Sequence, residues 1–489
     1  MRSKAKTRRM AMKTEKQKTA AAQNQATARQ AAGSGITLRP GQNIRVTIRR
    51  LGINGEGVGY YKRQVVFIDG TLPGEVVAAE IVDIETNYAV GKLKKIMQPS
   101  PQRVEPACPV YRSCGGCQLQ HLSYPGQLEA KMEMVREAFR RYTGLKEVPL
   151  RPIAGMDHPW AYRNKAQLQA GYMNGKMVAG LYAPGTHHIV ELTDCPIQHP
   201  KTNEIIQGTR NVLEELNIPA YDERKKTGVV RTIVARIGFE TEDCQLTLVT
   251  ATEKIPREAE LVQRLRARLP DVKSIMQNVN PRKTSLIFGD KTRVLWGASH
   301  IDEQLGEVKF SLSPRAFFQL NPEQTVKLYN YVKEAAALTG RELVVDAYCG
   351  VGTIGLWLAP EAKEVRGIEI IPEAVEDAKR NARRSRINNA RFYAGKAEVI
   401  LPQWVKQGIK PDVVVVDPPR SGCGRPLLEA LVKVKPKRIV YVSCNPATLA
   451  KDCDALLKGG FTIEWIQPVD MFPHTAHVEC VVSTYRVDK

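Results

Sequence analysis

The sequence predicts a multidomain protein with a small OB-like β-barrel, a central α+β domain and a C-terminal doubly wound α/β domain. At 489 residues the chain is too long for one hydrophobic core, because cores stop growing near roughly 250 to 300 residues. Short β-type runs separated by glycine and proline turns precede Gln98, and strands alternate regularly with helices after Asn321. We therefore expect a basic tail at 1–35, the barrel at 36–97, the central domain at 98–321 and the α/β domain at 322–489.

The charge balance favours a polyanionic partner. The chain has 72 Lys and Arg against 51 Asp and Glu, a formal net charge of +21, and a pI near 9.5. Such an excess is typical of nucleic-acid-binding proteins. A basic protein with no nucleic-acid role can have the same composition, so charge alone does not name the polymer.

The sequence shows neither a membrane span nor a secretion signal. No apolar run approaches the roughly 20 residues that a transmembrane helix needs, and the first residues lack the hydrophobic region of a signal peptide. The ten cysteines are spaced for ligation and chemistry, and a chain of this size needs no disulfide framework. We expect a cytoplasmic protein and favour a monomer.

The amino-terminal segment 1–35 predicts a disordered basic tail. From Met1 to Ala32 it has a single acidic residue, Glu15, and almost nothing to bury. Loose phosphate contact through counterion release and a tail without a role fit it equally well. A mitochondrial transit peptide fits less well because serine is scarce.

The segment 36–97 has the strand and turn pattern of a small barrel. Two β-type runs, Asn43–Arg50 and Gln64–Ile68, flank the motif Gly52-Ile-Asn-Gly-Glu-Gly-Val-Gly59, and Leu72-Pro-Gly-Glu75 follows. The segment resembles the TRAM domain, an RNA-binding barrel attached to several RNA-modifying enzymes. The resemblance implies RNA contact, although the packing of any small barrel would also require such glycines.

The remaining chain divides by its pattern of elements. The central part mixes a cysteine cluster, a helix expected at Tyr124–Tyr142 and β-type runs at Val229–Phe239 and Gln245–Thr250, which predicts an α+β domain. A helix is expected at Pro322–Leu338. Seven strands are expected after it, at Leu343–Ala347, Glu364–Ile370, Ala390–Ala394, Val413–Val416, Arg438–Ser443, Phe461–Val469 and Val478–Arg486. This alternation predicts a doubly wound sheet that binds its ligand at the carboxyl ends of the strands.

The first of these strands leads into a glycine turn. Gly350, Gly352 and Gly355 satisfy G-x-G-x-x-G, and glycines let the backbone approach a ligand closely. Asp346 precedes the turn, and Glu369 ends the next strand, where a carboxylate can accept both ribose hydroxyls of an adenosine. The ligand can be a nicotinamide dinucleotide or S-adenosylmethionine on this evidence alone.

The fourth strand ends in Asp417-Pro-Pro-Arg420. This segment resembles the Asp-Pro-Pro signature of base-modifying methyltransferases, in which it lines the gap between the methyl donor and the target base. A strand that merely ends in a proline turn is the alternative. No separate nicotinamide signature is present, so the motif favours S-adenosylmethionine.

The fifth strand ends in Ser443-Cys-Asn-Pro446, which supplies a nucleophile. One reaction that needs such a cysteine is methylation of carbon 5 of uracil, because this carbon is too weakly nucleophilic to attack a sulfonium methyl directly. A thiolate that adds to carbon 6 gives an enolate whose carbon 5 can attack, and a base must later remove the carbon 5 proton. Free thiols are only a few per cent ionised at neutral pH, so we expect the site to favour the thiolate, with Arg420 as a candidate contributor.

These motifs, followed by Phe472-Pro-His-Thr-Ala-His-Val-Glu-Cys480, resemble the RNA uridine C5-methyltransferase family and its class I methyltransferase fold. The resemblance implies that Cys444 is the nucleophile and Glu479 the general base. Partial burial in an apolar run would raise the pKa of Glu479 toward a useful range. The cofactor-binding positions that the resemblance implies are Gln319, Tyr348, Glu369 and Asp417.

Other residues near these motifs have weaker assignments. Cys349 and Cys423 lie close to cofactor motifs and could compete for the nucleophile role, but their motif context favours packing or loop positions. His474 and His477 could orient the base or the RNA, and a structural role is at least as consistent with the sequence.

Four cysteines form a candidate metal site. Cys108, Cys114 and Cys117 have C-x5-C-x2-C spacing, and Cys195 is a distant fourth thiol. Four thiolates suit zinc or an iron–sulfur cluster, and disulfides or unrelated thiols are the alternatives. The resemblance favours a 4Fe-4S cluster, because the ribosomal RNA branch of the family carries one on this pattern. We expect its role to be structural and RNA-positioning, since methyl transfer requires no electron.

We expect an enzyme that transfers a methyl group from S-adenosylmethionine to C5 of a uridine in RNA, with 23S ribosomal RNA favoured because tRNA-specific members commonly lack the cluster and the barrel. A tRNA enzyme, a noncatalytic RNA-binding protein on the same fold, and an NAD-dependent oxidoreductase with an iron–sulfur centre are the alternatives. The resemblance covers nearly everything after the tail.

Overall fold

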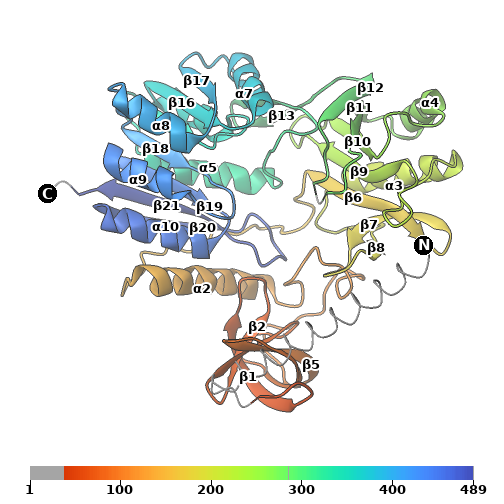
Figure 1. Ribbon diagram of the computed structural model, residues 1–489, viewed down its shortest axis with the longest axis horizontal. Helices are drawn as coiled ribbons and strands as arrows, with labels where there is room; N and C mark the ends of the chain where they lie inside the picture. Colours follow the sequence, from red (N-terminus) through yellow and green to blue (C-terminus); the bar gives the residue numbers. More distant parts are fainter. Residues whose placement is uncertain (1–37, 285, 488–489) are drawn as a thin grey trace, which may run out of the picture. The chain divides into compact units, whose positions relative to one another are not determined.

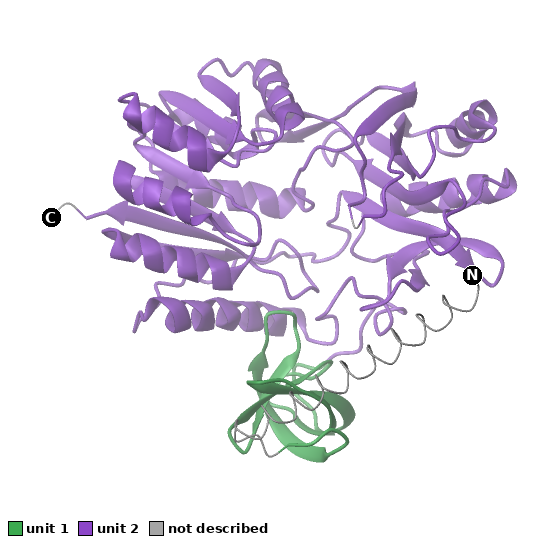
Figure 2. Cartoon of the chain, in the orientation of Figure 1, with its two compact units in different colours: residues 1–103 green, residues 104–489 purple. Residues whose placement is uncertain are grey.

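The computed structural model describes residues 38–284 and 286–487. The chain divides into two compact units, Met1–Arg103 and Val104–Lys489 (Figure 2). The predicted tail at 1–35 lies outside the described residues. Across the described segments, no helix is both long and apolar enough to cross a membrane.

The first unit is a closed five-stranded barrel with the strand order β1-β2-β3-β5-β4. Its strands are β1 (Asn43–Leu51), β2 (Gly57–Tyr61), β3 (Gln64–Ile68), β4 (Val76–Ile84) and β5 (Tyr88–Gln98). Alternating apolar residues of β1, such as Ile44, Val46 and Ile48, fill the barrel core, because successive side chains of a strand point to opposite faces. A Cβ at Gly57 would lie 1.9 Å from Thr71 Oγ1, so this position needs glycine. The predicted barrel is confirmed.

The second unit begins with a long helix and a mostly antiparallel sheet (Figure 1). The sheet has seven strands in the order β12-β11-β10-β9-β6-β7-β8. In chain order, this part of the unit contains α2 (Tyr124–Thr143), β6 (Lys165–Met173), β7 (Lys176–Tyr182), β8 (Ile189–Glu191), α3 (Pro200–Glu215), β9 (Val230–Ile237), β10 (Cys244–Thr250), α4 (Glu258–Arg268), β11 (Val272–Val279) and β12 (Lys291–Gly297). Helices α3 and α4 pack on one face of the sheet, around a core that includes Ile205, Leu213 and Leu261.

The C-terminal part is a second seven-stranded sheet with helices on both faces (Figure 1). A short hairpin, β13 (Ile301–Leu305) and β14 (Val308–Leu312), leads into it. The strands are β15 (Leu343–Ala347), β16 (Glu364–Glu369), β17 (Ala390–Ala394), β18 (Val413–Val416), β19 (Arg438–Ser443), β20 (Phe461–Val469) and β21 (Glu479–Arg486). The helices are α5 (Pro322–Ala336), α6 (Thr353–Leu358), α7 (Pro372–Arg384), α8 (Ala397–Lys406), α9 (Arg425–Val434) and α10 (Pro446–Lys458), with a 3-10 turn, η1, at Ala359–Glu361.

The strand order of this sheet, β17-β16-β15-β18-β19-β21-β20, places the chemistry at one edge. Strands β15 to β19 are parallel to one another, whereas β21 runs antiparallel to β19 and β20. The carboxyl ends of β15, β16, β18 and β19 therefore share an edge with the amino end of β21. The predicted doubly wound fold is confirmed, with a continuous apolar run such as Val413–Val416 buried on both faces.

A buried ion pair joins α2 to the chain just after β20. Lys131 Nζ lies 2.5 Å from Asp470 Oδ1, both side chains are fully buried, and Tyr124 donates a hydrogen bond of 2.9 Å to Asp470 Oδ2. Removing one partner leaves a buried charge uncompensated.

We expect Lys131→Met to lower the free energy of unfolding by about 3–5 kcal/mol, measured by urea titration. Lys176→Met, at an exposed position, is the control; a loss below about 1 kcal/mol for Lys131→Met would contradict the expectation.

Candidate active site

Five candidate residues lie at the shared edge of the C-terminal sheet. Tyr348 and Asp417 directly follow β15 and β18, and Glu369 ends β16. Cys444 directly follows β19, and Glu479 begins β21. Because Ser443 pairs with Cys480 in the β19–β21 register, the nucleophile and base candidates emerge next to each other from neighbouring strands.

The turn after β15 is shaped for close backbone approach. Gly350 and Gly352 have φ of 54° and 84°, conformations that favour glycine. Glu369 supports the turn because its Oε2 accepts a hydrogen bond from Gly350 N at 3.1 Å and its Oε1 accepts one from Ile371 N at 2.8 Å. Asp346 Oδ2 accepts a hydrogen bond of 2.8 Å from Gly355 N, while its buried Oδ1 has no partner among the described residues.

Tyr348 is held by a residue that the sequence alone did not single out. Its hydroxyl donates a hydrogen bond of 2.6 Å to Glu398 Oε1, at the start of α8, and its φ of 68° is unusual for a residue with a side chain. Non-glycine residues in this region cluster at functional sites. The sequence carried no signal for Glu398, because the two residues are 50 positions apart.

Gln319 lies in the segment that precedes α5. The residue is buried, and its carbonyl accepts a hydrogen bond of 3.0 Å from Asn164 Nδ2. Asn321 caps α5 by accepting a hydrogen bond from Gln324 N. Two residues before Gln319, the ring of Phe317 is 65% exposed.

Burial and the charges around Cys444 raise its pKa. Burial, followed by the charges of Glu479 and Asp417, raises the pKa of the thiol to about 11, and Arg420 opposes this. The expectation that the site favours the thiolate is therefore wrong for the free protein, because burial of the thiol and then the two carboxyl groups outweigh one guanidinium. Arg420 does act in the expected direction.

The two carboxyl groups themselves hold protons readily. Burial and then the charge of Asp417 raise the pKa of Glu479 to about 8, and Arg420 again opposes the shift. Burial also raises the pKa of Asp417 to about 7. The predicted direction for Glu479 is confirmed, and these carboxyl groups can accept or release a proton near neutral pH.

The two competing cysteines lie in the core. Cys349 and Cys423 are 5% and 7% exposed, whereas Cys444 is partly exposed. Burial raises the pKa of Cys349 well above its ordinary value and that of Cys423 to about 12. Of these three thiols, Cys444 has the best combination of access and pKa for attack on a ligand.

The two histidines occupy the loop between β20 and β21. The ring of His474 stacks on Trp160 with centroids 3.7 Å apart. His477 Nε2 lies 3.2 Å from Arg420 Nη2. Burial, then the charges of Arg420 and other cations, lowers the pKa of His477 to about 4, so the neutral ring accepts a hydrogen bond from the guanidinium.

The four candidate metal ligands lie near one another. The charges of Cys195 and Cys114 each raise the pKa of Cys117, although burial is the main cause of its rise to about 12. Burial also raises the pKa of Cys195, with smaller effects of Cys108 and Cys114. Within 38–284 and 286–487, no group of three or more His, Cys, Asp or Glu side chains is arranged so that it could hold a metal ion.

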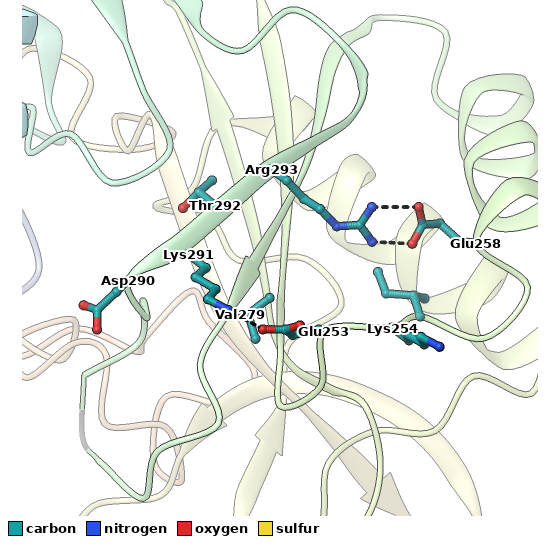
Figure 3. Close-up of a pocket in the computed structure, with 9 residues that line it drawn as sticks. Glu253, Lys254, Glu258, Val279, Asp290, Lys291, Thr292 and Arg293 are labelled. Carbon is teal, nitrogen blue, oxygen red and sulfur yellow. Dashed lines mark hydrogen bonds and ion pairs between the residues drawn. The ribbon is translucent and has the colours of Figure 1, made fainter.

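A cavity of about 840 Å³ lies elsewhere, at β12 and the start of α4 (Figure 3). Arg293 faces Glu258, donating Nη1 to its Oε1 at 2.9 Å, and Lys291 lies 2.5 Å from Glu253. None of the candidate residues lines this cavity. Its charges are largely paired with one another, so it is not the centre of the chemistry described above.

Comparison with known proteins identifies the family. Residues 285–487 match the family model tRNA (Uracil-5-)-methyltransferase, and residues 38–94 match the TRAM domain. An uncharacterized RNA methyltransferase of Halalkalibacterium halodurans is 55% identical over 92% of this chain and 97% of its own length. One from Listeria monocytogenes is 50% identical over 92% of this chain and 98% of its own.

A solved structure covers almost the same extent. The tRNA (uracil-54, C5)-methyltransferase of Pyrococcus abyssi, in complex with S-adenosyl-L-homocysteine, matches with a TM-score of 0.72 and 30% identity, over 90% of this chain and 100% of its own. The C-terminal sheet thus has the fold of S-adenosylmethionine-dependent methyltransferases. The chain belongs to the RNA (uracil-5-)-methyltransferase family and is an S-adenosylmethionine-dependent RNA methyltransferase.

Proposed function

We propose that this enzyme methylates carbon 5 of a uridine in 23S ribosomal RNA through a covalent bond between Cys444 and carbon 6. The observation that carries the proposal is the placement of Cys444 and Glu479 side by side, at the end of β19 and the start of β21. C5 methylation of uracil needs one nucleophile and one base on the same ring, and these residues meet that need.

The reaction balances with these two side chains. The Cys444 thiolate adds to carbon 6, and the enolate so formed attacks the methyl group through carbon 5, leaving S-adenosylhomocysteine. Glu479 then takes the proton from carbon 5, the electrons of that C–H bond restore the ring double bond, and the bond to Cys444 breaks with its electrons returning to sulfur. The target base must leave its stack to reach the thiol.

The methyl donor binds at the glycine turn in this proposal. Glu369 would accept the ribose hydroxyls, and its hydrogen bond from Gly350 N, which orients the carboxylate toward the turn, supports this role. Gln319, Tyr348 and Asp417 complete the binding set. A sulfonium bound beside Asp417 and Cys444 would lower the pKa of both side chains relative to the free protein.

Burial of the base predicts a pH dependence. Glu479 must be ionised to accept the carbon 5 proton, and its pKa is raised to about 8. Below that pH the protonated fraction rises, so we expect breakdown of the adduct to slow about tenfold per pH unit and to level off above it. Asp417 and Arg420 act on the pKa of Glu479, and the charge of Glu479 in turn raises the pKa of Cys444, Cys480 and Tyr329.

The measurement follows the decay of a preformed, methyl-labelled protein–RNA adduct between pH 6 and pH 9. Starting from the adduct separates proton removal from carbon 5 from the earlier ionisation of the thiol. If the 5-methyluridine RNA were released at a rate independent of pH between 6 and 8, this result would contradict a base with a raised pKa. A rate that fell with rising pH would assign the last step to an acid instead.

For the cysteine cluster we propose a 4Fe-4S centre on Cys108, Cys114, Cys117 and Cys195. The proposal rests on the set of four free thiols and on the packing of Cys117 and Cys195 against one core cluster. When bound, such a centre crosslinks the segment around Cys114 to the segment around Cys195. Methyl transfer needs no electron, and iron and sulfide analysis of protein purified without oxygen tests the proposal against zinc.

The substrate branch needs a direct test. The TRAM barrel and the cysteine cluster favour ribosomal RNA, whereas the Pyrococcus abyssi structure belongs to a tRNA enzyme. We would supply labelled S-adenosylmethionine with unmodified 23S ribosomal RNA and, separately, with tRNA, and identify the labelled nucleoside. 5-Methyluridine from ribosomal RNA supports the whole proposal, the same product from tRNA alone overturns the substrate, and another nucleoside overturns the Cys444 mechanism.

A further inference from the structure

The loop that leads into Glu479 contains a strained residue. His474 has a φ of 68° and is 4% exposed. A residue with a side chain rarely adopts this conformation, and it persists only where its surroundings hold it. The loop is short, since Asp470 directly follows β20 and β21 begins at Glu479.

Among the hydrogen bonds that hold this loop, four join His474 and Ala476 to the segment 118–119 and to Gln127. The carbonyl of His474 accepts from Gln118 N at 3.1 Å and from Leu119 N at 2.9 Å. The amide of His474 donates to Gln127 Oε1 at 2.8 Å. Ala476 N donates to Gln118 Oε1 at 3.3 Å. Both backbone groups of the strained residue are thus fixed by partners about 350 residues away in sequence.

The two glutamines are themselves anchored on different supports. Gln127, on α2, is 1% exposed and donates through Nε2 to Leu122 O at 2.8 Å. Gln118 follows Cys117 and donates through Nε2 to Gly115 O at 2.9 Å. The loop is therefore held once by a helix and once by the cysteine segment.

Beyond this loop the chain reaches the base within three residues. Ala476, whose amide is held by Gln118, is followed by His477, which contacts Arg420, and then by Val478 and Glu479. The β-sheet fixes Glu479 on its other side, where it pairs with Val469. A shift of the loop would consequently move the side chain of Glu479 and its neighbour Arg420 relative to Cys444.

We propose that Gln127 and Gln118 are positioning residues for the general base: they hold the loop around His474 so that the Glu479 carboxylate reaches the carbon 5 proton. The proposal rests on the proposed function of Glu479. Glu479 acts only after the methyl group has been transferred, so a displaced base leaves the C5-methylated ring attached to Cys444 through carbon 6. Loss of either glutamine should therefore trap this adduct, whereas a general loss of stability or of RNA binding would not.

The test compares two substitutions of Gln127. Gln127→Met keeps the length of the side chain but removes the acceptor for His474 N, and Gln127→Glu restores an acceptor oxygen. Gln245→Met is the matched control, because Gln245 is 2% exposed and bonds Ser274 Oγ in the central sheet. Gln118→Met and Gln118→Glu are an independent second pair of variants, and the iron content of each variant protein is measured together with its activity.

The readout is a single turnover with labelled S-adenosylmethionine, in which label in the denatured protein–RNA adduct is separated from label in free RNA. We expect Gln127→Met to slow adduct breakdown about ten- to a hundredfold with little change in adduct formation, and Gln127→Glu to recover most of the rate. Gln245→Met should behave as the wild type. If Gln127→Met does not fold, the same result is required of Gln118→Met with its iron content unchanged.

Two outcomes overturn the positioning role: equal slowing of adduct formation and breakdown, or wild-type breakdown in the Met variants. A third outcome is distinct from these. If the wild-type enzyme forms no covalent complex with 5-fluorouridine RNA, which cannot lose a proton from carbon 5, the Cys444 mechanism itself fails and the positioning role falls with it.

Discussion

Cys444→Ala is expected to reduce methyl transfer at least about a thousandfold while leaving the affinity for S-adenosylmethionine nearly unchanged. The thiol is needed to activate carbon 5, and no other thiol among those described near the sheet edge combines its access and lower pKa. The glycine turn and Glu369, which bind the donor in our proposal, do not depend on the Cys444 side chain. Turnover of labelled donor and a binding titration measure the two effects separately.

Cys423→Ala is the matched control for this experiment. It removes a buried thiol close to the same edge, and it should retain most of the activity with some loss of stability. The wild type and Cys423→Ala should both form a denaturation-resistant complex with 5-fluorouridine RNA, and Cys444→Ala should form none. Activity retained by Cys444→Ala and lost by Cys423→Ala would reassign the nucleophile.

The fold was predictable where its determinants are local in sequence. The alternation of apolar runs with glycine and proline turns predicted the strands of both the barrel and the C-terminal sheet. The helix expected at Tyr124–Tyr142 extends to Thr143 as α2. Its packing against α10 was not predictable, because that contact joins segments more than 300 residues apart and its apolar face alone does not identify a partner. A domain boundary at 321/322 stays a prediction.

The candidate site shows the same division. The motif around Asp417 and the one around Cys444 are each contiguous, and the parallel strands bring them to one edge as expected. The raised pKa of Cys444 could not be predicted, since it depends first on the burial of the thiol and then on the charges of Glu479 and Asp417. The hold of Gln127 on His474 was likewise invisible, because 347 positions separate the two residues.

Glu479→Gln is expected to stop the reaction one step later than Cys444→Ala does. The amide cannot accept the carbon 5 proton, so the methyl group transfers once and the product stays bound to Cys444. We expect release of 5-methyluridine RNA to fall about a hundred- to ten-thousandfold, with labelled adduct approaching one per enzyme. The substitution also removes a charge that raises the pKa of the Cys444 thiol, so adduct formation should not slow and should need a less alkaline pH.

A denaturing gel with labelled donor separates the possible roles of Glu479. Glu464→Gln is the control, because Glu464 lies on β20, pairs with Arg438 Nη1 at 2.8 Å and has no contact with Cys444 or Glu479 in the structure described. Release of free product at a near-normal rate from Glu479→Gln would assign the proton to another base, for which Asp417 is the candidate because its charge reaches both residues. Absence of any adduct would instead place Glu479 before methyl transfer, as the group that ionises the thiol. Cys444→Ala is thus expected to block the reaction before the covalent intermediate forms, whereas Glu479→Gln is expected to block it after methyl transfer and to accumulate that intermediate.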